Sequence, residues 1–425
     1  MTTGASTIVE RALDTLTTFT TTASMRVLAA IDDPVGLIAT IGTNPDAGAV
    51  HERIRRRGPL ARSLTGDYVA SSHDLCRRLL RDPRVGVRYA DGRSGQSGGR
   101  FTNDAAMTES FLELDDPQHA RLRRYAAPAF RPVIIRRYAP KIESLVHRLI
   151  DDAERRGRFD LIADIAAPLP IAVISDLLAI PEVHRIRFAE IGNVVGKALD
   201  GVTSRTQAQQ LMRAERELAA LFDQLSTERR KNPGDDVIST LVAARDSGGI
   251  TQQDLLATCE LLLIAGFETT VNLIGNAIAV MLKAGEPWQQ LVADPDLAEQ
   301  AVEETLRFEP PVQFTSRITH EPMEVNGRRL PAGVTIILDL AAANRDPDVF
   351  DEPTRFRLDR TGDDEHLAFS SGIHYCLGAG LARLEGAVAL RALSQRMPTL
   401  QIIGKGVPRG ASTIRGYSSL PMALR

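Results

Sequence analysis

The sequence predicts a mainly α-helical domain with a small β portion, and three observations support this prediction. Apolar residues recur at helical spacing through most of the chain from Pro117 to Phe308. Alternation typical of strands comes only later, in EVNGRRLPAGVTIIL at 324–338, where NG and PAG are turn sequences. No internal repeat and no linker-like stretch divides the chain, so we expect residues 24–425 to form a single domain.

Local signals predict the individual elements in chain order. HERIRRRG at 51–58 predicts a helix, PLARS and DYVAS predict two short strands around the turn TGD, and HDLCRRLL at 73–80 predicts another helix. Gly, Ser and Asp dominate residues 88–106, so we expect a long loop, which in a compact domain is usually functional or disordered. Helical breaks are expected at Gly157 and at Pro168–Pro170, and the tail has the pattern of strands.

Composition limits the class of protein. Of the 425 residues, 43% are hydrophobic and 25% are charged, which is typical of globular proteins and excludes disordered, collagenous or coiled-coil chains. The 51 Lys and Arg residues against 54 Asp and Glu residues leave a net charge of −3, so no global excess of positive charge favours nucleic acid. A chain of this length can bury most of its unfolded surface and can therefore hide a cofactor.

The chain carries no clear targeting signal. Residues 1–23 are rich in Thr and lack a basic start followed by an apolar stretch, so we expect a mobile arm and no secretory signal. No stretch of about 18 apolar residues without charge predicts a transmembrane anchor. Cys76, Cys259 and Cys376 show no CxxC spacing, which argues against a disulfide framework or a cysteine zinc site and favours a cytoplasmic, reducing location.

The segment FSSGIHYCLGAGLAR, residues 369–383, is the sharpest feature of the sequence. Cys376 lies between Gly372 and Gly378 on a tight turn, and helical spacing resumes at Leu381, so we expect the cysteine at the start of a helix. The helix dipole and free N–H groups favour a thiolate there, and the thiolate is the form that binds metal. From these residues alone, a buried structural cysteine and a catalytic thiol nucleophile remain alternatives.

The wider pattern F-x-x-G-x-H-x-C-x-G resembles the haem-loop motif of the cytochrome P-450 family, and further family motifs follow in order over residues 45–425. The pattern is carried by Phe369, Gly372, His374, Cys376 and Gly378. The resemblance implies the cytochrome P-450 fold, with haem b (iron protoporphyrin IX) buried between the long central helix and the helix after the cysteine. It also implies that Cys376 is the axial ligand of the haem iron, that Phe369 packs beside the sulfur and that His374 lies near a haem propionate.

The apolar segment LLLIAGFETTVN carries the second chemical signal. Leu261, Ala265, Glu268 and Thr269 share one arc at helical spacing, and a Glu beside a Thr inside an apolar helix is costly unless both are satisfied. A Thr bonded to its own helix, with the Glu at a solvent seam, is the alternative interpretation. The resemblance implies that Thr269 holds the proton-delivering hydroxyl, that Glu268 is the acid that feeds it, and that Ala265 leaves room for O2 over the iron.

Cationic side chains on an apolar helix face predict an anionic group opposite them. In DPQHARLRR, residues 116–124, His119 and Arg123 are spaced i,i+4 on the same side as apolar residues, where a cation needs an anion. A partly exposed helix face is the alternative. The resemblance implies that His119, Arg123 and Arg317 bind the haem propionates.

A second charged pair, in AVEETLRF, receives a structural interpretation. Glu304 and Arg307 are spaced i,i+3 on one helix face, and as an exposed pair they would contribute little to stability. The resemblance implies a buried network behind the haem, in which Arg355, from PTRF at 353–356, joins this pair. We therefore assign Glu304, Arg307 and Arg355 to structure and not to catalysis.

The resemblance implies a haem-thiolate monooxygenase that inserts one oxygen atom of O2 into an apolar small molecule by hydroxylation or epoxidation. Because the chain has no flavin or iron–sulfur motif, its two electrons must come from another protein, and the expected donor is a ferredoxin served by its reductase. A non-catalytic haem protein and a peroxide-driven haem-thiolate enzyme are the rival classes, and the Glu-Thr pair argues against both.

The expected contact surfaces complete these predictions. The loop at 88–111 and the helices around 182–225 are expected to form a lid. The substrate pocket is expected to be lined by Leu261, Ile264, Ala265, Val312, Phe314, Tyr417 and Ser418. A basic patch on the cysteine side of the haem is expected to receive the ferredoxin, the alternative being arginines spread over unrelated surfaces. The residues of this patch are Arg121, Arg124, Arg131, Arg136, Arg137 and Arg383.

Overall fold

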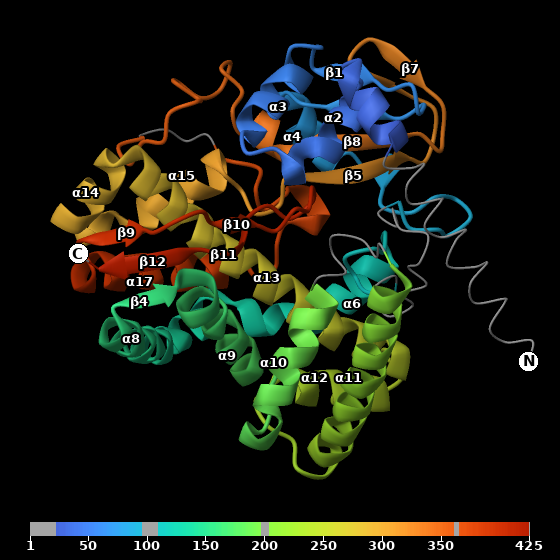
Figure 1. Ribbon diagram of the computed structural model, residues 1–425. Helices are drawn as coiled ribbons and strands as arrows, with labels where there is room; N and C mark the ends of the chain where they lie inside the picture. The colour runs from blue at the N-terminus through green and yellow to red at the C-terminus, as the bar shows by residue number, and fades with distance from the viewer. Residues whose placement is uncertain (1–22, 96–108, 197–203, 361–364, 425) are drawn as a thin grey trace, which may run out of the picture.

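The computed structural model describes residues 23–95, 109–196, 204–360 and 365–424. Most of the expected arm and the centre of the expected loop at 88–111 therefore lie outside the described residues. The prediction of a mainly helical protein with a small β portion is confirmed. In Figure 1 the long helix α13 (Gln252–Ala284) crosses the centre, helices α8 to α12 lie on one side of it, and the N-terminal helices and the largest sheet lie at the other end.

The remaining helices have the following bounds: α2 Pro34–Thr40, α3 Ala47–Arg55, α4 His73–Arg81, α6 Gln118–Ala126, α7 Pro132–Ile135, α8 Ala139–Arg156, α9 Pro168–Leu177, α10 Glu182–Gly196, α11 Arg205–Lys231, α12 Val237–Asp246, α14 Glu286–Ala293, α15 Ala298–Phe308, α16 Leu340–Ala343 and α17 Ala379–Arg396. α2 was not predicted. The expected break at Gly157 is confirmed, because α8 ends there with a positive φ of 68°. The expected break at Pro168–Pro170 is also confirmed, because a π-helix ends at Ala166 and α9 begins at Pro168, where a missing N–H costs no helical hydrogen bond.

α13 is the core helix of the molecule. A capping box begins it: Thr251 Oγ1 accepts a hydrogen bond from the backbone N–H of Asp254 at 3.0 Å, and Asp254 Oδ2 accepts one from that of Thr251 at 2.8 Å. Gly285, with a φ of 79°, ends it. The helix is long and apolar enough to cross a membrane, but 83% of its most apolar stretch is buried against the surrounding protein.

The strands form one five-stranded sheet and three small ones. The main sheet has the order β1-β2-β8-β5-β3, in which β2 and β8 are parallel and the other neighbours antiparallel. The predicted run 324–338 divides into a hairpin, turned at Asn326 and Gly327 with φ of 50° and 73°, and strand β8. The strand bounds are β1 Leu60–Arg62, β2 Tyr68–Ala70, β3 Val85–Gly86, β4 Arg158–Asp160, β5 Phe314–Thr319, β6 Met323–Val325, β7 Arg328–Leu330, β8 Thr335–Asp339, β9 Leu400–Ile402, β10 Val407–Pro408, β11 Tyr417–Ser419 and β12 Pro421–Leu424.

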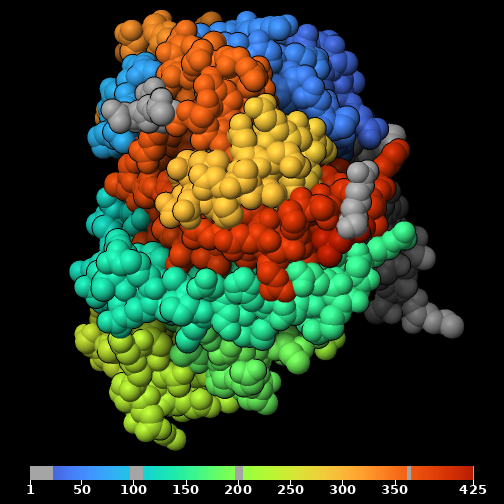
Figure 2. Space-filling view, turned by 90° about the vertical axis from the view of Figure 1, so that its left-hand side faces the viewer, coloured from blue at the N-terminus to red at the C-terminus, as the bar shows by residue number. Residues whose placement is uncertain are grey.

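Several other helices pack against helix α17. It packs against α15 on one side and against α8 on the other, and against α13 on a third face. Figure 2 shows the C-terminal segment as a red band between the yellow region of α14 and α15 and the teal region that contains α8. This packing fixes the start of α17, which follows the predicted cysteine loop directly.

A buried network around Glu304 joins α15 to the loop that precedes the cysteine segment. The Glu304 carboxylate accepts two hydrogen bonds at 2.7 Å from Arg307, and only 3% of each side chain is exposed. It also accepts hydrogen bonds from Arg360 Nε at 3.0 Å and from the backbone N–H of Arg357 at 2.9 Å. The carboxylate is therefore fully satisfied, as a buried charge must be.

The predicted role of Arg355 in this network is wrong. Its side chain is 61% exposed and pairs with Glu352 at 2.7 Å, while its carbonyl accepts hydrogen bonds from Arg307 and Arg360. The third side chain of the network is that of Arg360, five residues further along. The chain turns after PTRF, so Arg360 comes back to Glu304, which spacing in the sequence alone could not indicate.

We predict that Arg360→Ala lowers the free energy of unfolding by about 2–3 kcal/mol, somewhat less than the ~3–5 kcal/mol for breaking a buried pair, because Arg307 still neutralises Glu304. Arg355→Ala removes an exposed pair and is expected to leave the stability close to wild type. Denaturant unfolding of both variants tests this order. Equal destabilisation by the two substitutions would contradict the assignment of Arg360.

Candidate functional site

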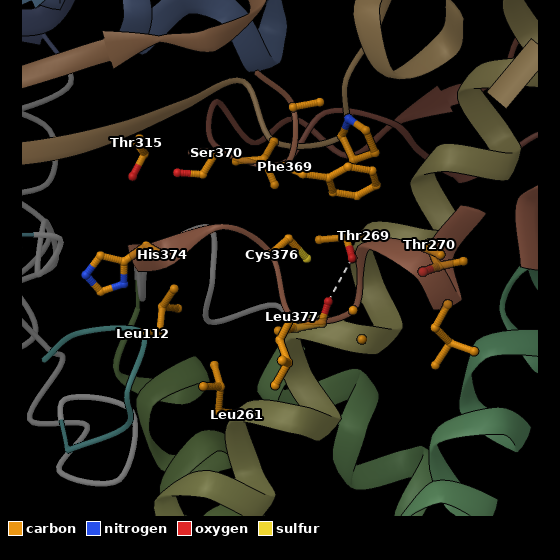
Figure 3. Close-up of a pocket in the computed structure, with 18 of the residues that line it drawn as sticks. Leu112, Leu261, Thr269, Thr270, Thr315, Phe369, Ser370, His374, Cys376 and Leu377 are labelled. Carbon is orange, nitrogen blue, oxygen red and sulfur yellow. Dashed lines mark hydrogen bonds between the residues drawn. The ribbon is translucent and has the colours of Figure 1, made fainter. Parts of the chain in front are cut away.

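A mainly apolar cavity of about 310 Å³ lies between α13 and α17, and β5 and several loops close it. Helix α13 contributes a stripe of residues at helical spacing, with Leu261, Ala265 and Thr269 among them. The predicted cysteine loop, which precedes α17, lines the same cavity. Figure 3 shows Cys376 and Thr269 both reaching into this space.

Cys376 is held in a loop that the surrounding backbone shapes. Its N–H donates to the Phe369 carbonyl at 2.9 Å, and α17 begins three residues later. Gly372 has a φ of 69°, and a Cβ there would lie 2.4 Å from the Leu80 carbonyl oxygen, so only glycine fits. The tight turn predicted from the sequence is therefore present, and it leaves the Cys376 side chain open to the cavity.

The surroundings of Cys376 shift the pKa of its thiol in opposite directions. Burial raises the pKa of the thiol, whereas the backbone N–H groups of Gly378 and Ala379 and the charges of Arg123 and Arg383 lower it. The other two cysteines, Cys76 and Cys259, are fully buried in apolar clusters away from the cavity, and burial raises the pKa of each thiol.

An aromatic and ionic cluster supports the loop from behind. The Arg383 guanidinium lies 4.6 Å from the centre of the Phe369 ring and binds the Glu303 carboxylate at 2.7 and 3.1 Å. Although burial raises the pKa of Glu303, hydrogen bonds from His366 and Arg383 hold it at about 2. Arg383 is thus committed to Glu303 and the loop. Its side chain is 32% exposed, so its place in the expected basic patch stays a prediction.

One end of the cavity gathers cationic and imidazole groups. Arg123, Arg317 and His374 line the cavity there, and the His119 ring lies 4.5 Å from that of His374. Within the described ranges, no carboxylate lies within 4 Å of either arginine. Burial lowers the pKa of Arg317 to about 10. Burial, followed by the positive charges of Arg317 and its neighbours, lowers that of His374 to about 2.

Two buried ring nitrogens at this end also lack partners. His119 Nε2 and His374 Nε2 make no hydrogen bond with any described residue, whereas His119 Nδ1 contacts Asp116 at 3.2 Å. Buried polar atoms are rarely left unsatisfied. Two arginines without a carboxylate partner and two unbonded imidazole Nε2 atoms therefore suit an anionic group at this end, as the sequence predicted.

The side chains of the predicted pair on α13, Glu268 and Thr269, lie in different surroundings. Thr269 Oγ1 lines the cavity and donates to the Ala265 carbonyl at 2.7 Å, the dashed line in Figure 3, so it also makes the bond to its own helix that the alternative reading foresaw. Glu268 is 5% exposed, does not line the cavity and forms an ion pair with Arg409, a residue that sequence reasoning missed. Adjacent helical positions point about 100° apart, which explains the separation.

The predicted pocket residues divide into two groups. Leu261, Ala265, Val312 and Phe314 line the cavity as expected. Ile264 does not, because it packs into the apolar cluster beneath α10 and α11.

The predicted contribution of the C-terminal tail is displaced by a few residues. Tyr417 and Ser418 lie on β11 outside the cavity, where Tyr417 Oη bonds Lys283 at 2.9 Å and Ser418 Oγ bonds the Val407 carbonyl at 3.2 Å. Thr413 and Ile414 line the cavity instead. The sequence held no signal for this, because the tail segment has no regular period between its strands.

Comparison with known proteins agrees with this geometry. Residues 174–397 match the model of the family described as Cytochrome P450. The chain is 37% identical to the cytochrome P450 monooxygenase PikC of Streptomyces venezuelae over 394 residues, 89% of this chain and 91% of that one. It is 38% identical to the biotin biosynthesis cytochrome P450 of Bacillus subtilis over 337 residues, 79% of this chain and 84% of that one.

Solved structures show the same likeness. P450BioI in complex with an acyl carrier protein ligated to hexadec-9Z-enoic acid has a TM-score of 0.82 at 32% identity, covering 91% of this chain and all of that one. Ligand-free CYP164A2 of Mycobacterium smegmatis has a TM-score of 0.81 at 39% identity, with coverages of 91% and 98%. The fold and site define a haem-dependent, oxygen-incorporating oxidoreductase. The chain belongs to the cytochrome P450 family.

The cofactor of this family is haem b, and the cavity residues fit it. The Cys376 thiol opens into the cavity, and the thiolate form of cysteine is the one that binds metal. Arg123 and Arg317, which pair with no carboxylate among the described residues, and the unbonded Nε2 atoms of His119 and His374 suit the two carboxylates of a porphyrin at one end of that space. The agreement between haem b and this cavity therefore depends on the Cys376 thiol and on buried polar groups without hydrogen-bond partners.

Proposed function

We propose that this protein is a haem-thiolate monooxygenase that inserts one atom of O2 into an apolar small molecule, by hydroxylation or epoxidation. The overall reaction consumes the substrate, O2, two electrons and two protons, and it releases the oxygenated product and water. The observation that carries the proposal is that the Cys376 thiol and the Thr269 hydroxyl open into one apolar cavity with an orphaned cationic end.

Each residue has a distinct task in this mechanism. Cys376 holds the haem iron, and Arg123, Arg317, His119 and His374 hold the propionates. The bound haem supplies the oxygen-activating chemistry, and thiolate ligation favours O–O cleavage. The apolar wall excludes water from the reacting groups.

Proton delivery is assigned to α13. The Thr269 hydroxyl donates a proton inside the cavity, and Glu268, once it has taken up a proton from solvent, restores it. Because the Glu268 carboxylate is held by Arg409 away from the cavity, its side chain must rotate before it can reach the hydroxyl. The ion pair with Arg409 therefore fixes the position of the Glu268 carboxylate between turnovers.

The substrate is proposed to be apolar, with a small number of hydroxyl contacts. Thr315 and Thr413 supply polar atoms at the wall formed by β5 and the tail, whereas Leu112, Leu261 and Val312 are apolar. Two related structures have fatty acyl ligands, hexadec-9Z-enoic acid on a carrier protein and myristic acid. Fatty acids are therefore the first compounds to screen, before steroids, terpenoids and macrolides, by the spin-state shift of the Soret band.

Cys376→Ser tests the axial ligand. The reduced wild-type protein with carbon monoxide is expected to show the red-shifted Soret band of a thiolate-ligated haem, and Cys376→Ser is expected to abolish it, because serine supplies no thiolate. Cys76→Ser and Cys259→Ser are the matched controls and should keep the band. Its retention in Cys376→Ser would disprove the assignment.

Thr269→Ala tests the proton relay. The variant is expected to keep its substrate affinity but to lose about 10²-fold in product formed with reductant and O2, the lower end of what a general acid contributes, with electrons diverted to peroxide or water. Turnover driven by added peroxide should change little, because peroxide supplies both electrons and protons. Unchanged coupling of reductant to product would refute the relay.

The same pair of assays separates the rival classes. A peroxide-driven enzyme would turn over with peroxide and not with reductant and O2, and a gas sensor or carrier would form product with neither. Substrate-dependent turnover with reductant and O2 is the result that supports a monooxygenase.

We propose a ferredoxin as the electron donor, docking beside the cysteine loop. Of the predicted patch, Arg121 is paired with Asp254 at 2.9 Å, and Arg383 is paired behind the loop. The remaining exposed arginines include Arg136 and Arg137, which follow α7, and α7 packs against α17. An acidic partner attracted to these side chains would arrive near the start of α17. We also place the enzyme in the cytoplasm, where its unpaired cysteines suit a reducing environment.

Reversing Arg136 and Arg137 to Glu is expected to slow reduction by ferredoxin at low salt, with the difference from wild type shrinking as the screening length falls to ~10 Å at about 0.1 M. Substrate binding should not change. The double reversal of Arg328 and Arg329, which are exposed on β7, is the control with the same change in charge. Wild-type reduction rates across the salt range would place the docking surface elsewhere.

A further inference from the structure

A buried carboxyl group lines the cavity and has no part in the mechanism above. Helix α17 turns Gly378, Leu381, Ala382 and Glu385 toward the cavity, and Glu385 is the last residue of this stripe. Only 2% of Glu385 is exposed. Beside it, a Cβ at Gly386 would lie 2.9 Å from Val302 of α15 and 3.4 Å from Leu273 of α13, so the helix is closely packed at this point.

Glu385 is not neutralised by any of its surroundings. Its Oε2 atom is buried and makes no hydrogen bond with the residues that the structure describes. An unpaired buried carboxylate is costly, so burial raises the pKa of Glu385 to about 8, and burial is the sole cause of that shift. The group is therefore a neutral carboxylic acid at pH 7.

The ion pairs and hydrogen bonds that the structure shows for charged side chains on α13, α15, α8 and α17 do not involve Glu385. The pairs are Glu268 with Arg409 and Lys283 with Tyr417 on α13; Glu303 with Arg383, and Glu304 with Arg307 and Arg360, on α15; Asp151 and Glu154 with Arg396 on α8; and Arg391 with Asp296. Since each of these groups has its own partner, none offers Glu385 a countercharge.

We propose that Glu385 is a proton-binding site that, in alkaline solution, takes up a proton from solvent when the cofactor of this cavity accepts an electron. The electron adds negative charge to a space of low dielectric, where charges interact more strongly than in water. A carboxylate in the same space then binds a proton more tightly. The electron comes from the donor protein, the proton converts the carboxylate to the acid, and no other bond changes.

The direction of the pH dependence follows from these charges. Below pH 8 the acid is protonated in both oxidation states, so reduction takes up no proton and the midpoint potential is independent of pH. Above pH 8 the oxidised protein has lost the proton that the reduced protein retains, so the potential falls as the pH rises. The inference rests on the haem of the family and not on the proposed substrate or electron donor.

The test is a spectroelectrochemical titration of the substrate-free holoprotein between pH 6.5 and 10. The wild-type midpoint is expected to be flat to about pH 8 and then to fall by up to about 59 mV per pH unit, the limit for one proton taken up with one electron. Glu385→Gln, which keeps the shape and removes the titration, is expected to stay flat. Asp296→Asn removes an exposed carboxylate next to α17 and should behave as wild type.

Two results would overturn the proposal: a flat wild-type curve, or the same fall in Glu385→Gln as in wild type. If Glu385→Gln fails to retain haem, infrared difference spectra of the wild type decide. Reduction at pH 9 is then expected to produce the carbonyl band of a protonated carboxylic acid, and its absence refutes proton uptake by a buried acid. None of these measurements depends on product formation.

Discussion

The structure depends on one constraint: the Cys376 thiol, which we propose works as an anion, opens into an internal cavity whose low polarity favours its neutral form. The apolar wall that would exclude water from the reaction also raises the pKa of Cys376. The N–H groups of Gly378 and Ala379 lower this pKa. Two arginines on different elements, Arg123 on α6 and Arg383 on α17, lower it as well. Helix packing around α17 keeps these groups in place.

Charge in the cavity is segregated, which makes one orientation of a flat, doubly carboxylated cofactor favourable. The cationic end lies at α6 and β5, and the opposite wall is formed by apolar residues of α13 and α17. A reversed cofactor would leave two carboxylates in an apolar wall and two arginines without anions, and both are costly. Glu385, at the end of the α17 stripe, also lines the cavity, and its Oε2 atom has no hydrogen-bond partner among the described residues.

Features that depend on residue spacing within one helix or loop could be predicted from the sequence. Features that depend on how distant segments fold back onto one another could not. The cysteine turn, the cavity stripe of α13 and the cations His119 and Arg123 follow from spacing within one element. Arg360 could not be distinguished from Arg355, because the choice between them depends on how the loop after PTRF turns back. Arg409 lies 141 residues from its partner Glu268, and no periodicity connects two such positions.

Two adjacent carboxylates on α15 connect the sulfur environment to the framework of the protein. Glu303 holds the arginine that covers the Phe369 ring, and Glu304 holds the arginines of the buried network. Successive helical positions point about 100° apart, so one turn of helix braces two separate regions. A small shift of α15 would therefore move both regions together. Sequence variation among descendants of this chain should therefore accumulate where β5 and the C-terminal tail line the cavity. These segments can change shape without moving Glu303 and Glu304.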